Sequence, residues 1–282
     1  MRFAMTSRTL SAAISLVAFF GYSSALCAQA AKTPTLGEIL QRLEANLNHY
    51  DTGVPSFFCD EHVISKMEPG VRDQDTITDS VFRLKRTADS DHTTALVESR
   101  EIKSVNGKPP TKRDLKGPTV VSGVFEGGLA VVSHNQTACM RYDLQRINRK
   151  RPTDPYIVRF ATALTPENTA DCLLQEKSKG LVFIDPASMQ ITHLELTTPR
   201  HTIIPGNAYE SAVVGKRDLT VDYAPVLLGG QSFWMPSTIT SRNVGGIGTF
   251  DVTVWSFQAT YRNYHRLEVT SRILPAGEVP GP

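Results

Sequence analysis

The sequence lacks an excess of charge of one sign, a membrane-length apolar run and any recognisable catalytic motif. Its 282 residues hold 30 Lys and Arg against 28 Asp and Glu. Arg2 and Arg8 lie in an N-terminal segment that we expect to be removed, which leaves 28 of each. A balanced charge gives no electrostatic attraction to nucleic acid, so we predict no nucleic-acid partner. No apolar stretch after residue 30 approaches the about 20 residues of a membrane-spanning helix, so we expect no stable membrane insertion of the mature chain.

The start of the chain has the pattern of a cleavable export signal. It is positively charged, then apolar over residues 10–20 (LSAAISLVAFF), and residues 28–30 (AQA) supply the small side chains that signal peptidase needs. We predict a signal peptide over 1–30, cleaved after Ala30, and a mature protein that is periplasmic or secreted. An uncleaved membrane anchor is the alternative, because weakly apolar residues continue to Cys27.

Cysteine is scarce, and an odd number of cysteines remains once the predicted signal peptide is removed. Cys59, Cys139 and Cys172 are left in the mature chain. In an oxidising compartment three cysteines predict one disulfide and one buried thiol. We favour a Cys139–Cys172 bridge because these two fall in neighbouring segments, whereas Cys59 lies in an apolar strand near the start. The sequence leaves all three pairings open.

The mature chain predicts one helix followed by many strands. Apolar residues recur at helical spacing from Leu36 to Leu47, and Thr35 can cap this helix. The later segments are short, rich in β-branched and aromatic residues, and separated by turn signals. The expected strands are 57–66, 80–86, 95–105, 181–184, 191–198, 219–223, 233–241, 250–261 and 267–274, while 121–133 is ambiguous between a short helix and a strand.

This pattern indicates a mainly β fold with a covering helix. We expect a curved antiparallel sheet, forming an incomplete, half-open β-barrel, with the helix over one face. No internal repeat or Ser/Gly-rich linker marks a boundary. We therefore expect a single β-rich domain over 31–274 and a frayed C-terminal tail over 275–282.

Residues with chemical potential occur, but not in the arrangements that catalysis or metal binding requires. Residues 245–248 (GGIG) lie between two strand-like segments, which favours a hairpin turn over a dinucleotide loop. In the run from Cys59 to His62, strand alternation places Asp60 and His62 on one face and Glu61 on the other. A zinc site needs three or four convergent ligands, and the other histidines are scattered. We predict no catalytic residue, no metal and no cofactor, with a hydrolase or metal protein using Asp60 and His62 as the least favoured alternative.

Aromatic side chains are concentrated in two of the late strands. Phe233, Trp234, Trp255 and Phe257 are candidates to line an apolar cavity, because a curved sheet under a helix often encloses a ligand pocket. Packing of the same side chains beneath the covering helix is the alternative.

Four segments in order resemble a group of exported bacterial proteins. They are residues 54–65 (VPSFFCDEHVIS), 179–196 (KGLVFIDPASMQITHLEL), 219–242 (LTVDYAPVLLGGQSFWMPSTITSR) and 261–273 (YRNYHRLEVTSRI). These proteins are similar in turn to the LolA and RseB type of periplasmic proteins, whose fold is an incomplete antiparallel barrel with helices as a lid. The resemblance implies this fold and an apolar concave face for acyl chains or lipoproteins, and it carries over no individual site residue. The stretch 199–215 looks like an insertion relative to a minimal carrier.

The functional hypothesis is a non-catalytic periplasmic or secreted binding protein. Its ligand would be a lipid, an acyl chain or a lipidated protein held in the concave face of the half-barrel. The first alternative is a structural or signalling module of the cell envelope that binds another protein through a sheet edge or an apolar face. An open concave cavity favours the binder, and a packed concave face favours the module.

Overall fold

A computed structural model of the chain describes residues 33–67, 75–88, 94–112, 114, 123–148, 150–204, 207–247 and 250–268. The predicted signal peptide over 1–30 and the predicted tail over 275–282 lie outside these residues. By its contacts the chain divides into the units Met1–Thr33 and Pro34–Pro282, and every element named below belongs to the second unit.

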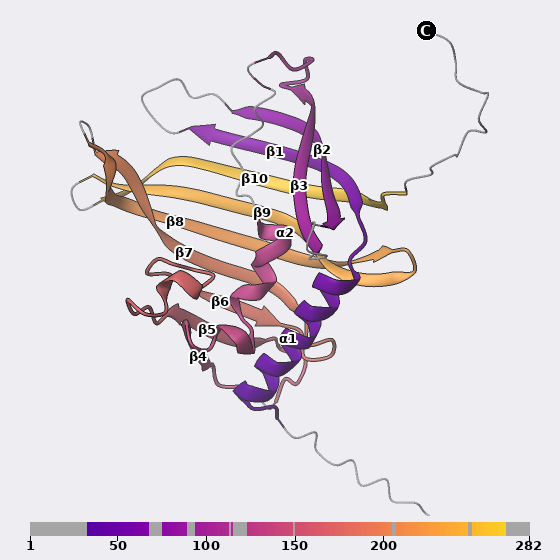
Figure 1. The fold of residues 1–282 in the computed structure, drawn as a ribbon, viewed down its shortest axis with the longest axis vertical. Helices are drawn as coiled ribbons and strands as arrows, with labels where there is room; N and C mark the ends of the chain where they lie inside the picture. The colour runs from indigo at the N-terminus through magenta and orange to yellow at the C-terminus, as the bar shows by residue number, and fades with distance from the viewer. Residues whose placement is uncertain are drawn as a thin grey trace, which may run out of the picture. The chain divides into compact units, whose positions relative to one another are not determined.

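Ten antiparallel strands of the described chain form one sheet, in the order β3-β2-β1-β10-β9-β8-β7-β6-β5-β4. Consecutive strands pair, except that β3 and β4 lie at opposite edges and β1 pairs with β10. The two unpaired edges leave the sheet open, so the expected mainly β, incompletely closed fold is confirmed (Figure 1). The strands are β1 (Phe57–Met67), β2 (Thr76–Ala88), β3 (Thr94–Val105), β4 (Met140–Leu144), β5 (Tyr156–Thr162), β6 (Lys179–Ile184), β7 (Ile191–Ile204), β8 (Asn207–Leu228), β9 (Gln231–Ile247) and β10 (Phe250–Arg266).

The covering helix α1 (Leu36–Gly53) begins where the sequence predicts and ends later. Thr35 caps it: the Thr35 side chain accepts the Glu38 N–H at 3.3 Å, and the Glu38 carboxylate accepts the Thr35 N–H at 2.7 Å. The helix continues past Leu47 because Tyr50, two turns beyond buried Leu43, extends the buried stripe and is itself only 3% exposed. It stops at Val54, which precedes a proline and is extended.

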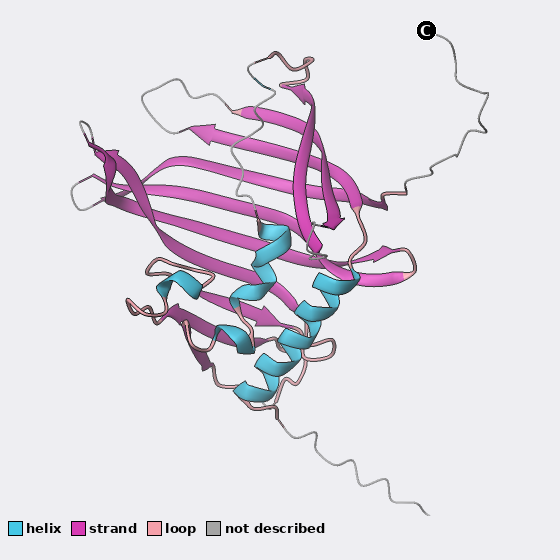
Figure 2. Ribbon diagram, in the orientation of Figure 1, coloured by secondary structure: helices cyan, strands magenta, loops and turns pink. Residues whose placement is uncertain are grey.

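A second helical segment links the two edges of the sheet. Residues 124–131 of the ambiguous stretch 121–133 are helical, as α2 (Val124–Gly127) and the 3₁₀ turn η2 (Gly128–Val131), and η3 (His134–Gln136) follows. Figure 2 shows α1 and this segment on the same face of the sheet. We call this covered face the inner face and the opposite one the outer face.

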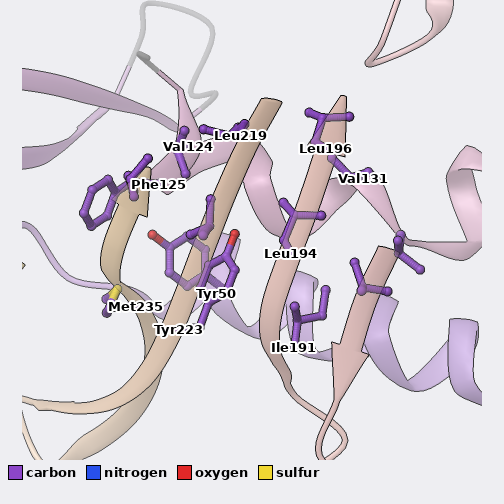
Figure 3. Close-up of a cluster of buried hydrophobic side chains, with 14 of the residues drawn as sticks. Tyr50, Val124, Phe125, Val131, Ile191, Leu194, Leu196, Leu219, Tyr223 and Met235 are labelled. Atoms are coloured by element: carbon purple, nitrogen blue, oxygen red, sulfur yellow. The ribbon is translucent and has the colours of Figure 1, made fainter. Parts of the chain in front are cut away.

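The core lies between the inner face and these helices. Side chains from α1, α2 and η2 meet alternate residues of β7, β8 and β9 there, as strand geometry requires (Figure 3). Tyr50 and Tyr223 lie close together in this cluster, which also contains Val131 and Leu196. Burial raises the pKa of both tyrosines well above the ordinary range, so they stay neutral.

The structure corrects several expected boundaries. The prediction of a strand over 267–274 is wrong for its first two residues, because Leu267 and Glu268 follow the end of β10 and belong to no strand. Residues 269–274 lie outside the described residues. β4 and β5 were not predicted, since their short segments flank a charged loop. The described parts of the stretch 199–215 are the end of β7 and the start of β8, and its interpretation as an insertion relative to a minimal carrier stays a prediction.

The predicted disulfide is confirmed. Cys139 and Cys172 are bonded with a Cα–Cα distance of 5.5 Å, and Cys59 is a free, buried thiol. The bridge ties the residue before β4 to the 3₁₀ turn η4 (Thr169–Asp171), and thereby fixes the loop that leads to β6. Burial raises the pKa of the Cys59 thiol above its ordinary value, which makes it a poor nucleophile.

Candidate functional site

The side chains of the inner face become progressively more exposed along the direction of its strands. One row of side chains, defined by the pairing register, crosses five central strands and is fully buried beneath the helices. Every member of this row is apolar and at most 2% exposed, so this part of the inner face is packed core, as expected of the protein-binding module, and the binder hypothesis is limited to the rim beyond it. The row comprises Val63, Ala259, Ile239, Val221 and Leu194.

The next row along the same strands is still buried but contains a polar group. Phe257, Ser241, Leu219 and Leu196 lie opposite one another in the register, and none is more than 9% exposed. The Ser241 hydroxyl is buried and has no hydrogen-bond partner among the described residues. A buried hydroxyl without a partner costs about 1–3 kcal/mol, so this position is unusual for a closed core.

A third row marks the rim of the covered region. Met67, Trp255, Asn243, Arg217 and Thr198 follow one another across β1, β10, β9, β8 and β7, and we call these five residues the rim row. Each lies two positions from an inner-face residue, which is half-buried Ser65 for Met67 and a buried residue for the other four, so strand alternation directs it to the same face. In Figure 1 the strands β7 to β10 extend to the left beyond α2.

The rim row combines apolar and cationic groups that solvent can reach. Met67 is 56% exposed, Trp255 is half-buried with its ring 5.1 Å from that of Phe257, and Arg217 is exposed. Within the part of the chain that the structure describes, neither Arg217 nor Asn243 makes a side-chain hydrogen bond or ion pair. An apolar surface thus adjoins two polar side chains that have no partner among the described residues.

A cleft of about 610 Å³ adjoins the β7 and β8 side of the rim row. It lies between these strands and the loop 173–178 that follows the disulfide. His201 and Glu176 pair inside it, with 3.3 Å between His201 Nε2 and Glu176 Oε2. The cleft is lined by Leu173, Leu174, Gln175, Glu176, Ser178, Thr198, Pro199, His201 and Arg217.

The four aromatic residues expected to line a cavity fall into two separate places. Trp255 and Phe257 lie together at and next to the rim row. Phe233 and Trp234 lie near the start of β9; Phe233 is 2% exposed, its ring stacks on that of His49 in α1, and Trp234 packs partly buried against the core. The structure therefore brings two of the four to the candidate site.

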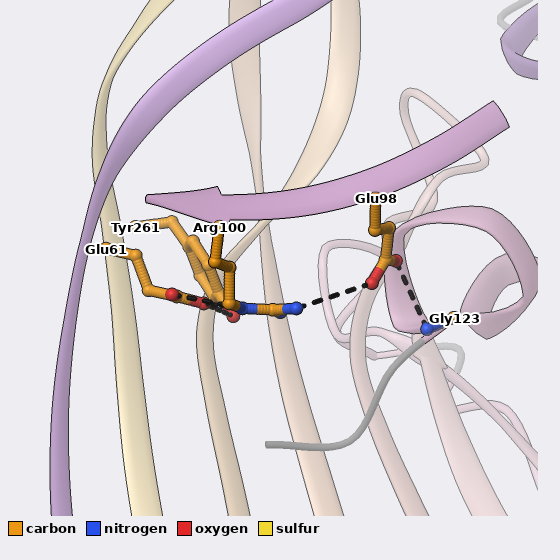
Figure 4. Close-up of polar contacts among 5 residues, drawn as sticks. All are labelled: Glu61, Glu98, Arg100, Gly123 and Tyr261. Carbon is orange, nitrogen blue, oxygen red and sulfur yellow. Dashed lines mark hydrogen bonds and ion pairs between the residues drawn. The ribbon is translucent and has the colours of Figure 1, made fainter. Parts of the chain in front are cut away.

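Sequence reasoning missed a buried polar network on the inner face. The Glu61 side chain is fully buried and accepts hydrogen bonds from Arg100 Nε at 2.8 Å and from the Tyr261 hydroxyl at 3.0 Å. The Arg100 Nη1 atom lies 3.9 Å from the Glu98 carboxylate, which accepts the Gly123 N–H at 3.2 Å (Figure 4). The alternation of β1 could have predicted that Glu61 is buried, because Glu61 lies two positions from each of the inward-facing residues Cys59 and Val63.

This network connects four segments of the fold and has a structural role. It joins β1, β3 and β10 to the residue that precedes α2, and Arg100 also lies 4.9 Å from the ring centre of Phe82. Burial alone would lower the pKa of Arg100, but the adjacent Glu61 carboxylate outweighs it and the pKa is raised. Burial and the same carboxylate raise the pKa of Tyr261. Arg100 therefore stays charged and Tyr261 stays neutral.

Asp60 and His62 lie on the outer face, as alternation predicts, and line a cleft of about 390 Å³ with Thr260, Arg262 and Asn263. His62 Nδ1 is 2.7 Å from the Asp79 carboxylate. The hydrogen bonds from His62 and from Ser104 lower the pKa of Asp79. The described residues contain no group of three or more side chains placed to hold a metal. A reaction at Asp60 and His62 stays an untested prediction.

No protein-family model matches the chain, and no curated protein matches it. Among solved structures, a domain described as an outer membrane lipoprotein-sorting protein from Vibrio parahaemolyticus is similar at 13% identity, covering 79% of this chain and 90% of that one, with a TM-score of 0.35. A LolA superfamily protein from Nitrosomonas europaea is similar at 10% identity, covering 86% and 96%, with a TM-score of 0.36. A DUF1329 family protein from Desulfovibrio piger shows 7% identity, covering 82% and 95%, with a TM-score of 0.38.

The resemblance predicted from the sequence thus recurs among solved structures. It concerns the fold alone. No helix in the described ranges is long and apolar enough to cross a membrane.

Proposed function

We propose that the protein is an exported, non-catalytic binding protein that holds an apolar chain at the rim of its inner face. The ligand is the acyl chain of a lipid or of a lipidated protein. The observation that carries this proposal is the graded inner face, which runs from dry core to the half-buried Trp255 and the exposed Met67.

The energetics favour occupation of this rim. Covering Met67 and Trp255 removes apolar surface from water, and each methylene of a ligand buried beside them contributes about 0.8 kcal/mol. Trp255 already contacts buried Phe257, so a chain laid against it continues the core outward. Methionine and tryptophan also suit a flexible ligand, because one adapts its shape and the other offers a large flat surface.

The compartment belongs to the proposal as well. The signal pattern over 1–30 and the Cys139–Cys172 disulfide are both expected of a protein that works in an oxidising space outside the cytoplasm. Cleavage after Ala30 would release a β-rich domain that begins at residue 31.

The test uses the two tryptophans of the chain as reporters. A Trp234→Phe variant retains Trp255, and a Trp255→Phe variant retains Trp234. Titration with brominated fatty acids should quench the emission of the first variant strongly and that of the second weakly, because bromine quenches only at short range. Native mass spectrometry of protein purified from the periplasm should show a bound lipid.

Equal quenching of both variants, or no quenching together with a lipid-free mass, would overturn the proposal. If crosslinking of such a lipid-free protein captured a single envelope protein, the alternative of a protein-binding envelope module would be favoured instead.

A further inference from the structure

We infer that the rim row selects amphiphiles with an anionic headgroup, a carboxylate or a phosphate, which Arg217 binds while the apolar chain lies against Trp255. This inference rests on the proposed function and adds the class of headgroup to it. Its basis is the register of the sheet, which places a cation beside the apolar part of the rim.

The spacing suits a single amphiphile. Trp255, Asn243 and Arg217 are consecutive across β10, β9 and β8, so the backbones of Trp255 and Arg217 are two strand spacings, about 10 Å, apart. A headgroup beside Arg217 therefore leaves its chain within reach of Trp255. The Asn243 amide between them can donate to the same headgroup.

The charges around Arg217 leave its guanidinium available. Asp218, its neighbour in sequence, lies on the outer face, where its carboxylate accepts the Thr197 hydroxyl at 2.8 Å and lies 3.9 Å from Lys216 Nζ. The acidic residue of the adjoining cleft, Glu176, is paired with His201. An arginine fork matches the paired oxygens of carboxylates and phosphates, so an anion is the ligand that this position favours.

An independent observation comes from the neighbouring row. Tyr50, Ser80, Tyr223 and Ser241 have buried hydroxyls without a partner among the described residues. Of these, Ser241 lies in the row that adjoins the rim row, beside Leu219 and Phe257. The Ser241 hydroxyl is closed to solvent, so a ligand ester or carboxylate oxygen supplies the missing partner only by displacing one of the side chains that cover it.

The experiment compares ligands of the same chain length in the Trp234→Phe background. Quenching by a brominated fatty acid, the matching brominated alcohol and a brominated lysophospholipid with an anionic phosphate headgroup would give three affinities. We expect both anionic ligands to bind at least about tenfold more tightly than the alcohol, the usual scale of a charged hydrogen bond. Arg217→Gln should reduce this preference to less than about threefold.

Matched controls separate recognition from general effects. Arg242→Gln removes an exposed arginine from the outer face of β9, next to Asn243, and should keep the preference. Ser241→Ala should lower acid affinity without lowering stability, whereas Ser80→Ala removes an equally buried hydroxyl away from the rim and should leave affinity unchanged.

The outcomes distinguish the two proposals. Equal affinity for acid and alcohol in the parent protein overturns the headgroup inference and leaves chain binding intact. Absence of binding by every chain overturns both. Inorganic phosphate alone is the last control. If it bound as tightly as the lysophospholipid and with the same dependence on Arg217, the site would bind free anions, and the inference that it selects amphiphiles would be overturned.

Discussion

Glu61 shows how a single residue can be placed by local alternation and yet given its role by distant partners. It is 1% exposed, and its two hydrogen-bonding partners come from β3 and β10. A buried carboxylate persists only where charge and hydrogen bonds compensate the loss of water. Arg100 and Tyr261 provide that compensation here.

Replacing Glu61 by Gln should destabilise the protein by about 3 kcal/mol, because Arg100 would stay buried beside a neutral amide. Urea denaturation followed by circular dichroism measures this loss. Glu101→Gln serves as the control: Glu101 is 47% exposed on β3 and pairs with Arg83 and Lys103, so its loss should lower stability far less than the loss of Glu61. Equal effects of the two substitutions would show that the buried network contributes nothing beyond a surface pair.

The sequence predicted the facing of Asp60, Glu61 and His62, because alternation is a local property of a strand. It did not predict that Glu61 pairs with Arg100, or His62 with Asp79. These partners are set by which strands lie side by side, and no short-range pattern encodes that choice.

At the scale of elements, close packing between β6 and β7 depends on Gly180. A Cβ atom built at this position would lie 2.0 Å from the Glu195 carbonyl oxygen and 2.4 Å from the Phe160 ring. Both neighbours are held by the sheet, since Phe160 is fully buried and Glu195 belongs to β7. Glycine is therefore required here by space.

Gly180→Ala should destabilise the protein by about 3 kcal/mol through overpacking. Gly37→Ala in the first turns of α1 meets nothing within 4 Å and should stabilise it by about 0.5–1 kcal/mol, because alanine loses less backbone freedom. Thermal and urea unfolding of both variants measures the contrast. A neutral Gly180→Ala would mean that β6 and β7 are further apart than the structure shows.

The elements themselves were predicted with unequal success. The capped start of α1 was correct because Thr35 and Glu38 form a local signal. Its end, and the full lengths of β7, β8 and β9, were underestimated, since long strands continue through polar residues wherever both neighbours supply hydrogen bonds. β5 was missed although Val158 and Phe160 are fully buried in it.

At the scale of the whole molecule, the disulfide between Cys139 and Cys172 closes a loop with a sequence separation of 33 residues. A Cys139→Ser, Cys172→Ser double variant should lose about 3–4 kcal/mol, because the unfolded chain regains the freedom that the bridge removes. Urea denaturation with and without reductant tests this. Reductant should lower the stability of the parent protein to that of the double variant and leave the variant unchanged; a parent protein insensitive to reductant would contradict the prediction.

The sequence by itself determined the properties that depend on neighbouring residues: the export signal pattern, the balanced charge, the capped helix, the alternation of β1 and the mainly β composition. Only the tertiary structure decided the pairing of β1 with β10, which places Met67 beside Trp255, and the register that sets Arg217 two strands away. The physical reason is that a strand's own pattern selects which face a side chain occupies, whereas its cross-strand neighbour follows from long-range pairing. The gradation of the inner face from buried core to exposed rim therefore follows from the tertiary structure and not from the sequence pattern of any one strand.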